Sequence, residues 1–151
     1  MKATPKPYPL PATPSADLAR VLDYWRGLLR GSAEIPFSDD LSLENLPDLG
    51  DRLGVIDVFE KPERFRVASL GAQLAADQSS PVADKFLDEV SLYYPLEFLR
   101  SQCSATMEAG APTCHTQGAS ADGLHAGYDR LVLPLWGNGY INMLLVAVDW
   151  H

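Results

Sequence analysis

The sequence has little cysteine and no cluster of basic residues, and each shortage excludes a class of protein. Its two cysteines, Cys103 and Cys114, match neither the spacing of a zinc site nor a CxxC redox pair. Lysine and arginine total 12 against 20 acidic residues, so the formal net charge is −8, which argues against a nucleic-acid partner. No apolar run reaches the roughly 18 residues of a membrane span, and the opening MKATPKPYPLPATPS lacks the apolar core of a signal peptide. We therefore expect a cytoplasmic protein without a membrane span.

What is present is the composition of a single globular domain. The 151 residues are 46% hydrophobic and 21% charged, enough to build a packed core. Residues 1–14 hold five of the twelve prolines, which predicts a flexible, extended lead that could also act as a docking arm. Residues 15–31 are predicted to form a helix, and residues 32–151 the main domain.

The predicted N-terminal helix is amphipathic. Ser15 is a good N-cap and Gly31 stands where a C-cap glycine belongs, while Asp17, Arg20 and other charged residues occupy the opposite face. An apolar stripe of this kind must pack on something, so we expect a homodimer through this helix, with tryptophan as its main anchor. The expected interface consists of Leu18, Val21, Leu22, Trp25 and Leu29.

The rest of the chain predicts an α+β fold with one five-stranded antiparallel sheet and helices on one face. A short helical turn is expected at Ser42 to Leu46, a short helical segment from Gly71 onwards, and a longer helix over 95–110. The expected strands are residues 53–59, 64–70, 113–119, 125–135 and 140–148. Asn138-Gly139 predicts a tight hairpin between the last two strands, and the last strand is apolar on both faces, as a central strand would be. Pro134 is expected at a bulge or at the last paired residue.

Four pieces of the sequence, in order, resemble a PAS domain of the compact bacterial family in which that domain makes up nearly the whole protein. They are DYW at residues 23–25, the hairpin IDVFEKPERFRVASLG, the helix exit MEAGAP, and YDRLVLPLWGNGYINMLL. The chain departs from the family's usual glycine-rich turn, where it has QSSPVADKF. The resemblance implies a sensory or interaction module in bacterial signal transduction, with a pocket for a ligand and output through a protein partner.

Several side chains are candidates for that ligand pocket. If Arg130 and Tyr128 face inward, the guanidinium could hold a carboxylate or phosphate, the alternative being a structural ion pair. Asn142 is a polar residue within an apolar central strand and must find a partner if buried. The aromatic residues Tyr94 and Phe98 could line the pocket or simply fill the core.

The cofactor is left open, because haem and flavin are conceivable but nothing indicates either. His115 and His125 lie near the end of the sheet, and His115 is a candidate ligand contact, whereas a haem would need a proximal histidine in an enclosed pocket. The cysteine-bearing helix motif of photoactive flavin proteins is absent around Cys103.

Two functions from different classes follow. The first is a non-enzymatic signalling module that binds a small molecule, a protein partner, or both. The second is a small α+β cone-type enzyme in which His115 or His125 acts as a general base with an acid such as Asp129. The second requires those groups to converge, and no spacing in the sequence demands it. We therefore expect the first.

Overall fold

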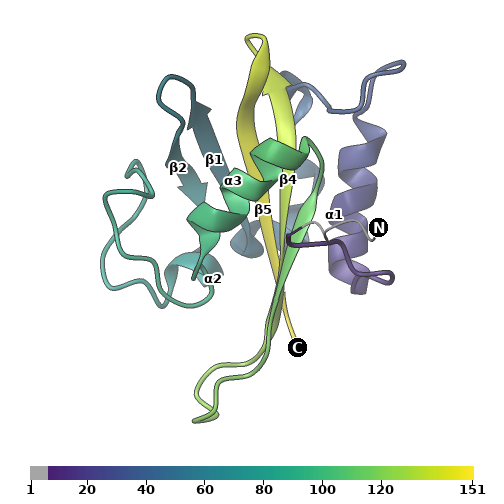
Figure 1. The fold of residues 1–151 in the computed structure, drawn as a ribbon. Coiled ribbons are helices and arrows are strands. Elements are labelled where there is room, and N and C mark those ends of the chain that lie inside the picture. The colour runs from purple at the N-terminus through teal and green to yellow at the C-terminus, as the bar shows by residue number, and fades with distance from the viewer. Residues whose placement is uncertain (1–6) are drawn as a thin grey trace, which may run out of the picture.

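The computed structural model describes residues 7–151 and folds them as an α+β domain (Figure 1). The first six residues of the proline-rich lead lie outside the described residues. The helices are α1 Ala16–Gly27, α2 Ala72–Ala75 and α3 Leu99–Ala109, with short 3-10 helices at Ser38–Asp40, Leu43–Asn45 and Pro47–Arg52. The strands are β1 Leu53–Phe59, β2 Arg64–Leu70, β3 Thr113–Gln117, β4 Tyr128–Gly137 and β5 Tyr140–Trp150.

The five strands form one antiparallel sheet in the order β2-β1-β5-β4-β3. This confirms the prediction of a five-stranded antiparallel sheet with the last strand in the middle. The hairpin between β4 and β5 turns at Asn138 and Gly139, whose φ angles of 57° and 88° lie in the left-handed region. Asparagine and glycine tolerate these angles best, which is why the dipeptide predicted the turn.

Both faces of the sheet are covered, whereas helices were expected on one face. Along β4, Leu131 and Leu133 belong to one apolar cluster with α1, while Val132 between them belongs to a second cluster with α3. Figure 1 shows α3 crossing in front of the sheet, with α1 set apart from it at the side. The alternation of side chains along a strand explains how one apolar strand supplies two cores.

Helix α1 packs its apolar stripe on the sheet of its own chain. Leu18, Val21, Leu22 and Trp25 are buried in the α1-side cluster. The indole Nε1 of Trp25 also donates a 2.8 Å hydrogen bond to the carbonyl oxygen of Pro134. The predicted dimer interface is thus occupied within the chain, because a second subunit could reach these side chains only if α1 left the sheet.

The end of α1 differs from the predicted end. The helix is capped at Leu28, and Gly31, with φ of 54°, lies in the following turn. Leu29, the fifth predicted interface residue, is therefore beyond the helix and only partly buried.

Pro134 is accommodated one residue before an irregularity in the strand. It pairs with Leu144, and the register of β4 against β5 shifts between Leu135 and Trp136. Its carbonyl oxygen accepts from Trp25, on the side away from β5, where β3 no longer pairs. The missing N–H of proline points to the same side and costs no ladder bond. The predicted bulge is thus present, but it follows Pro134.

The two edge strands are covered by irregular segments. Beside β2, the backbone of Val67 accepts from Asp84 and donates to Lys85, while Leu87 donates to Phe65. Beside β3, the N–H of Cys114 donates to the carbonyl oxygen of Tyr8 at 3.0 Å. The described end of the lead is therefore docked, and neither edge presents a long free ladder for pairing with another chain.

Element boundaries differ from the predicted ones mainly around α3. The helix was expected from residue 95 but begins at Leu99, because Phe98 has a left-handed φ of 61° that no helix can contain. The strands β1 and β2 have the predicted bounds, while β4 begins three residues later than expected. No helix of the described residues has the length and apolar character that crossing a membrane requires.

Candidate polar site under helix α3

All four buried polar or charged residues of the described chain lie in one place, between α3 and the strands β3 and β4. They are Gln102, Thr106, Thr113 and Arg130. The first two come from α3, one comes from β3 and one from β4, and hydrogen bonds connect them. A core of this size does not need such a cluster for stability, so it is the first candidate for a site.

Arg130 is the centre of this polar cluster and is fully buried. Its Nε donates to Oε1 of Gln102 at 2.8 Å, and its Nη1 donates to the carbonyl oxygen of Pro95 at 2.9 Å. The second terminal nitrogen, Nη2, is buried without a hydrogen-bond partner among the described residues. No ion pair within residues 7–151 includes Arg130. The structural ion pair considered from the sequence is therefore not formed.

The remaining bonds of the polar cluster hold the arginine in place. Gln102 Nε2 donates to the carbonyl oxygen of Arg130 at 2.9 Å and to Thr113 Oγ1 at 3.2 Å. The hydroxyls of Thr106 and Thr113 lie 2.7 Å apart, and Thr106 also donates to the carbonyl oxygen of Gln102. These bonds connect α3 to β3 and β4, so the guanidinium sits in a rigid frame.

Aromatic rings that contact one another lie next to the arginine and form a rim, which consists of Tyr8, Tyr94, Phe98, His115 and Tyr128. Its guanidinium carbon lies 5.9 Å from the centroid of the Tyr128 ring, and His115 is its direct partner across the β3–β4 pair. The His115 ring lies 6.0 Å from Tyr128 and 6.3 Å from Phe98. Tyr94 in turn lies 5.5 Å from Tyr128. Five of the six predicted ligand residues thus meet here: Arg130, Tyr128, Phe98, Tyr94 and His115.

Burial sets the protonation of these groups. Burial lowers the pKa of Arg130, although an arginine stays charged at neutral pH. Burial, with the nearby Arg130 charge second, lowers the pKa of His115, which favours the neutral imidazole. Its Nε2 is also buried without a partner in the described chain. Burial raises the pKa of Tyr128, whose hydroxyl donates to Glu97 Oε1 at 3.0 Å.

An open groove lies beside the polar cluster. It has a volume of about 450 Å³, and Tyr93, Tyr94, Glu97 and His125 are among the residues that line it. The rings of Tyr94 and His125 stack at 4.2 Å, and the Tyr94 hydroxyl donates to the carbonyl oxygen of Ala126. Because Glu97 also accepts from Tyr128, the groove shares a wall with the arginine site.

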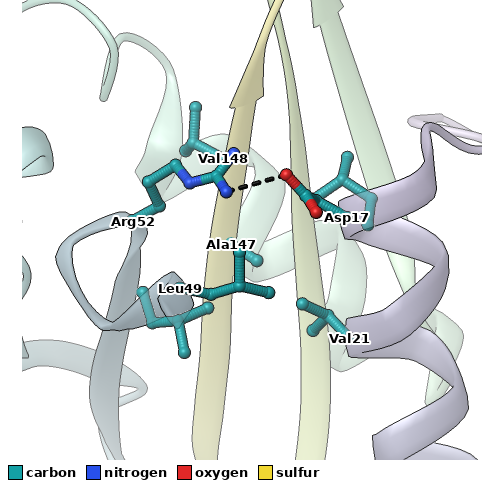
Figure 2. Close-up of a pocket in the computed structure, with 8 residues that line it drawn as sticks. Asp17, Val21, Leu49, Arg52, Ala147 and Val148 are labelled. Carbon is teal, nitrogen blue, oxygen red and sulfur yellow. Dashed lines mark hydrogen bonds and ion pairs between the residues drawn. The ribbon is translucent and has the colours of Figure 1, made fainter. Parts of the chain in front are cut away.

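The cavity under α1, on the other side of the sheet, is much smaller. Figure 2 shows a cavity between α1 and the sheet, with Val21, Leu49 and Ala147 among its walls and the Asp17–Arg52 ion pair, 2.7 Å long, beside it. Its volume is about 10 Å³, close to the room needed for one water molecule. This cavity is therefore too small for an organic ligand.

Asn142 is the predicted ligand residue that lies elsewhere. It follows Ile141 on β5, near the hairpin turn, where its amide packs against Gly137 so closely that a Cβ there would lie 2.5 Å from Nδ2. Arg130 pairs with Val148, six residues further along β5. The Oδ1 of Asn142 is buried without a described partner, but it belongs to the hairpin and not to the polar cluster.

The histidine–aspartate pairing considered for an enzyme is not assembled. Asp129 accepts from Thr116 at 2.8 Å and lies 3.5 Å from His151. His115 alternates with Thr116 along β3 and faces the aromatic rim, while His125 stacks on Tyr94. The two free thiols are also poor nucleophiles, since burial raises the pKa of Cys103 to about 12 and that of Cys114 to about 11.

Gln102 and Glu97 were not predicted from the sequence as site residues. Gln102 falls three residues after Leu99 and one before Cys103, within a stripe at helical spacing that includes Leu96, Leu99 and Cys103. A polar residue in that stripe was a usable signal for a buried network. Glu97 gave no such signal, because its role depends on where the loop before α3 places it.

Residues 7–151 contain no group of three or more histidine, cysteine, aspartate or glutamate side chains that could hold a metal ion. Comparison with known proteins finds neither a family model nor a curated relative that matches this sequence.

Proposed function

We propose that this chain is a PAS-like sensory module that binds a small ligand and passes the signal to a protein partner in bacterial signal transduction, without chemistry of its own. The sheet order β2-β1-β5-β4-β3 and the helical connection from β2 to β3 across one face support the proposal, because a PAS-like core has this arrangement. Because one fold can host many functions, the proposal rests mainly on the site.

The observation that carries the proposal is the polar cluster centred on Arg130. A fully buried arginine without a carboxylate partner is expensive for a fold to keep. It lies between the sheet and α3, the place where a PAS-like module would hold its ligand. Neighbouring polar groups fix the guanidinium without neutralising it. A ligand that binds the guanidinium would compensate for the free energy lost by burying its charge.

Signal output would pass through the elements that frame the site. Gln102 and Thr106 connect the arginine to α3, and Tyr128 connects it to Glu97 in the loop before α3. A ligand that displaces one of these bonds changes the position of α3 or of the groove beside it. A protein partner that contacts α3 would then bind more strongly or more weakly. In this proposal the module acts in the cytoplasm.

Native mass spectrometry and an absorption spectrum of the protein as purified test the proposal. A retained small molecule, or one from a compound collection that raises the melting temperature, is the expected result. The compound should be recovered chemically unchanged after long incubation. Its conversion to a product in a reaction that depends on His115 would contradict the non-enzymatic role.

A further inference from the structure

The described residues contain two orphaned polar atoms that belong to one cross-strand pair. Arg130 and His115 are directly opposite each other on β4 and β3, and directly paired residues of neighbouring strands share a face. Arg130 Nη2 and His115 Nε2 are both buried without a hydrogen-bond partner in residues 7–151. A native core rarely leaves two such groups on one pair.

The missing partner must supply negative charge as well as hydrogen-bond acceptors. A water molecule would satisfy hydrogen bonds but would leave the arginine charge uncompensated in the core. Glu97 is the nearest candidate anion within the rim, but it forms no ion pair with Arg130 and its Oε1 accepts from Tyr128. The site therefore lacks one unit of negative charge, and a carboxylate matches it.

We propose that the Arg130–His115 pair is a binding site for a small monocarboxylate with an apolar tail. This rests on the proposed function, since it names the ligand class of the same site. One carboxylate oxygen accepts from Arg130 Nη2 and the other from His115 Nε2–H. A single buried positive charge favours a monoanion over phosphate, and the net charge of −8 repels polyanions further.

The rings of the rim account for the apolar tail. Tyr8 and Phe98 lie 5.8 Å and 6.3 Å from the His115 ring, each edge-on, and Tyr128 lies at 6.0 Å. These rings give a tail apolar contacts beside the carboxylate position. An aromatic or short aliphatic acid fits this rim better than a sugar acid or an amino acid, whose extra polar groups would find no partners.

Phe98 is the side chain that can open the way in. Phe98 is 67% exposed, so moving its ring loses little buried area, although the ring lies 6.3 Å from that of His115. Its φ of 61° is unusual for a bulky residue, and such conformations concentrate at ligand clamps and switches. Because Phe98 directly precedes α3, its movement couples ligand entry to the start of that helix.

Isothermal titration of the full chain with benzoate, and with benzamide as its neutral isostere, tests the proposal. We expect benzoate to bind and benzamide to bind at least about tenfold more weakly, which corresponds to a lost charge-assisted hydrogen bond. His115→Phe should weaken benzoate by about tenfold, while His151→Phe, a histidine outside the site, should leave it unchanged. Equal binding of the two probes, or no effect of His115→Phe, would overturn the carboxylate site.

A second measurement avoids variants that could unfold, such as Arg130→Met. In wild-type protein, the His115 pKa followed by NMR should rise when benzoate is bound, because the carboxylate favours the imidazolium. An unchanged His115 pKa at saturation overturns the site. So does the absence of binding by benzoate, butyrate and acetate. If another class of small molecule is then found retained, the sensory module still stands; if none is found and a substrate is converted through His115, both proposals fall.

Discussion

The two faces of the sheet are built on different principles. On the α1 side, leucine, valine and tryptophan side chains pack around a cavity of only about 10 Å³, and the indole nitrogen of Trp25 donates to the Pro134 carbonyl oxygen. On the α3 side, the same strands carry the only fully buried charged residue of the described chain, with one nitrogen unsatisfied. Both faces therefore stabilise the sheet through buried apolar side chains, and the α3 side gives up part of that stability to hold a polar cluster.

Trp25→Ala should produce the largest loss of stability, because it removes a fully packed indole and its hydrogen bond from the α1 side. We expect the free energy of unfolding to fall by about 3–5 kcal/mol, measured by urea denaturation. Trp136→Ala is the matched control, since Trp136 is 37% exposed, and it should cost much less. If both cost the same, Trp25 does not anchor the α1-side cluster. A lower molecular mass of Trp25→Ala in solution, without loss of stability, would instead support the dimer predicted through α1.

Gln102→Leu tests the polar side and should cost about 1–3 kcal/mol, because it leaves Arg130 Nε without its partner and removes the bond from Gln102 to the Arg130 carbonyl oxygen. The double variant Arg130→Met with Gln102→Leu should be less destabilised than the sum of the two single variants. Urea denaturation of all four proteins gives the coupling free energy. Additive costs would mean that the two residues do not act as one cluster.

The pH dependence of stability should carry a contribution from His115. Burial lowers its pKa in the folded protein below the unfolded value of about 6.5, so the unfolded chain binds more protons in mildly acidic solution. The contribution is present above about pH 6.5 and is lost as the pH falls below it. We expect His115→Phe to flatten the acid limb of the curve of unfolding free energy against pH. A curve parallel to that of wild type would show that His115 titrates normally.

Cysteine labelling offers the finest comparison, since each face carries one thiol. Cys114 belongs to the α1-side cluster and Cys103 to the α3-side cluster. Their raised pKa values, about 11 and about 12, predict negligible reaction with a thiol reagent at pH 8 in the folded protein. Trp25→Ala should accelerate labelling of Cys114 more than that of Cys103, and Gln102→Leu should do the reverse. Mass spectrometry of the digested protein identifies the labelled residue.

The sequence was enough to predict the sheet, because its signals are local. The continuous apolar runs of β1 and β5 and the Asn138-Gly139 turn act through neighbouring residues and the backbone. The predicted start of α3 at residue 95 was wrong. Proline is common at the first position of a helix, but the left-handed conformation of Phe98 delays the helix to Leu99. A single residue held in that conformation by its surroundings leaves no trace in a helical pattern.

The site was predictable in its members and not in its geometry. Arg130 and Tyr128 are two residues apart on β4, so the sequence predicted that they share a face of the sheet. Asn142 was grouped with them because it also interrupts an apolar strand, but its distance along β5 from the partner of Arg130 separates the two. Arg130 is held by two neutral acceptors, Gln102 and the Pro95 carbonyl oxygen, and not by a carboxylate. These acceptors reach it only once α3 and the loop before it lie on the sheet.

The position of β5 has a consequence for biosynthesis. It is the last of the five strands to leave the ribosome, yet it supplies the shared neighbour of β1 and β4. Until then the nascent chain can form the β1–β2 hairpin and the β3–β4 pair only as separate units, each with an exposed apolar edge. Completion of the sheet therefore waits for the synthesis of β5, and the interval before it is when a chaperone would have most to protect.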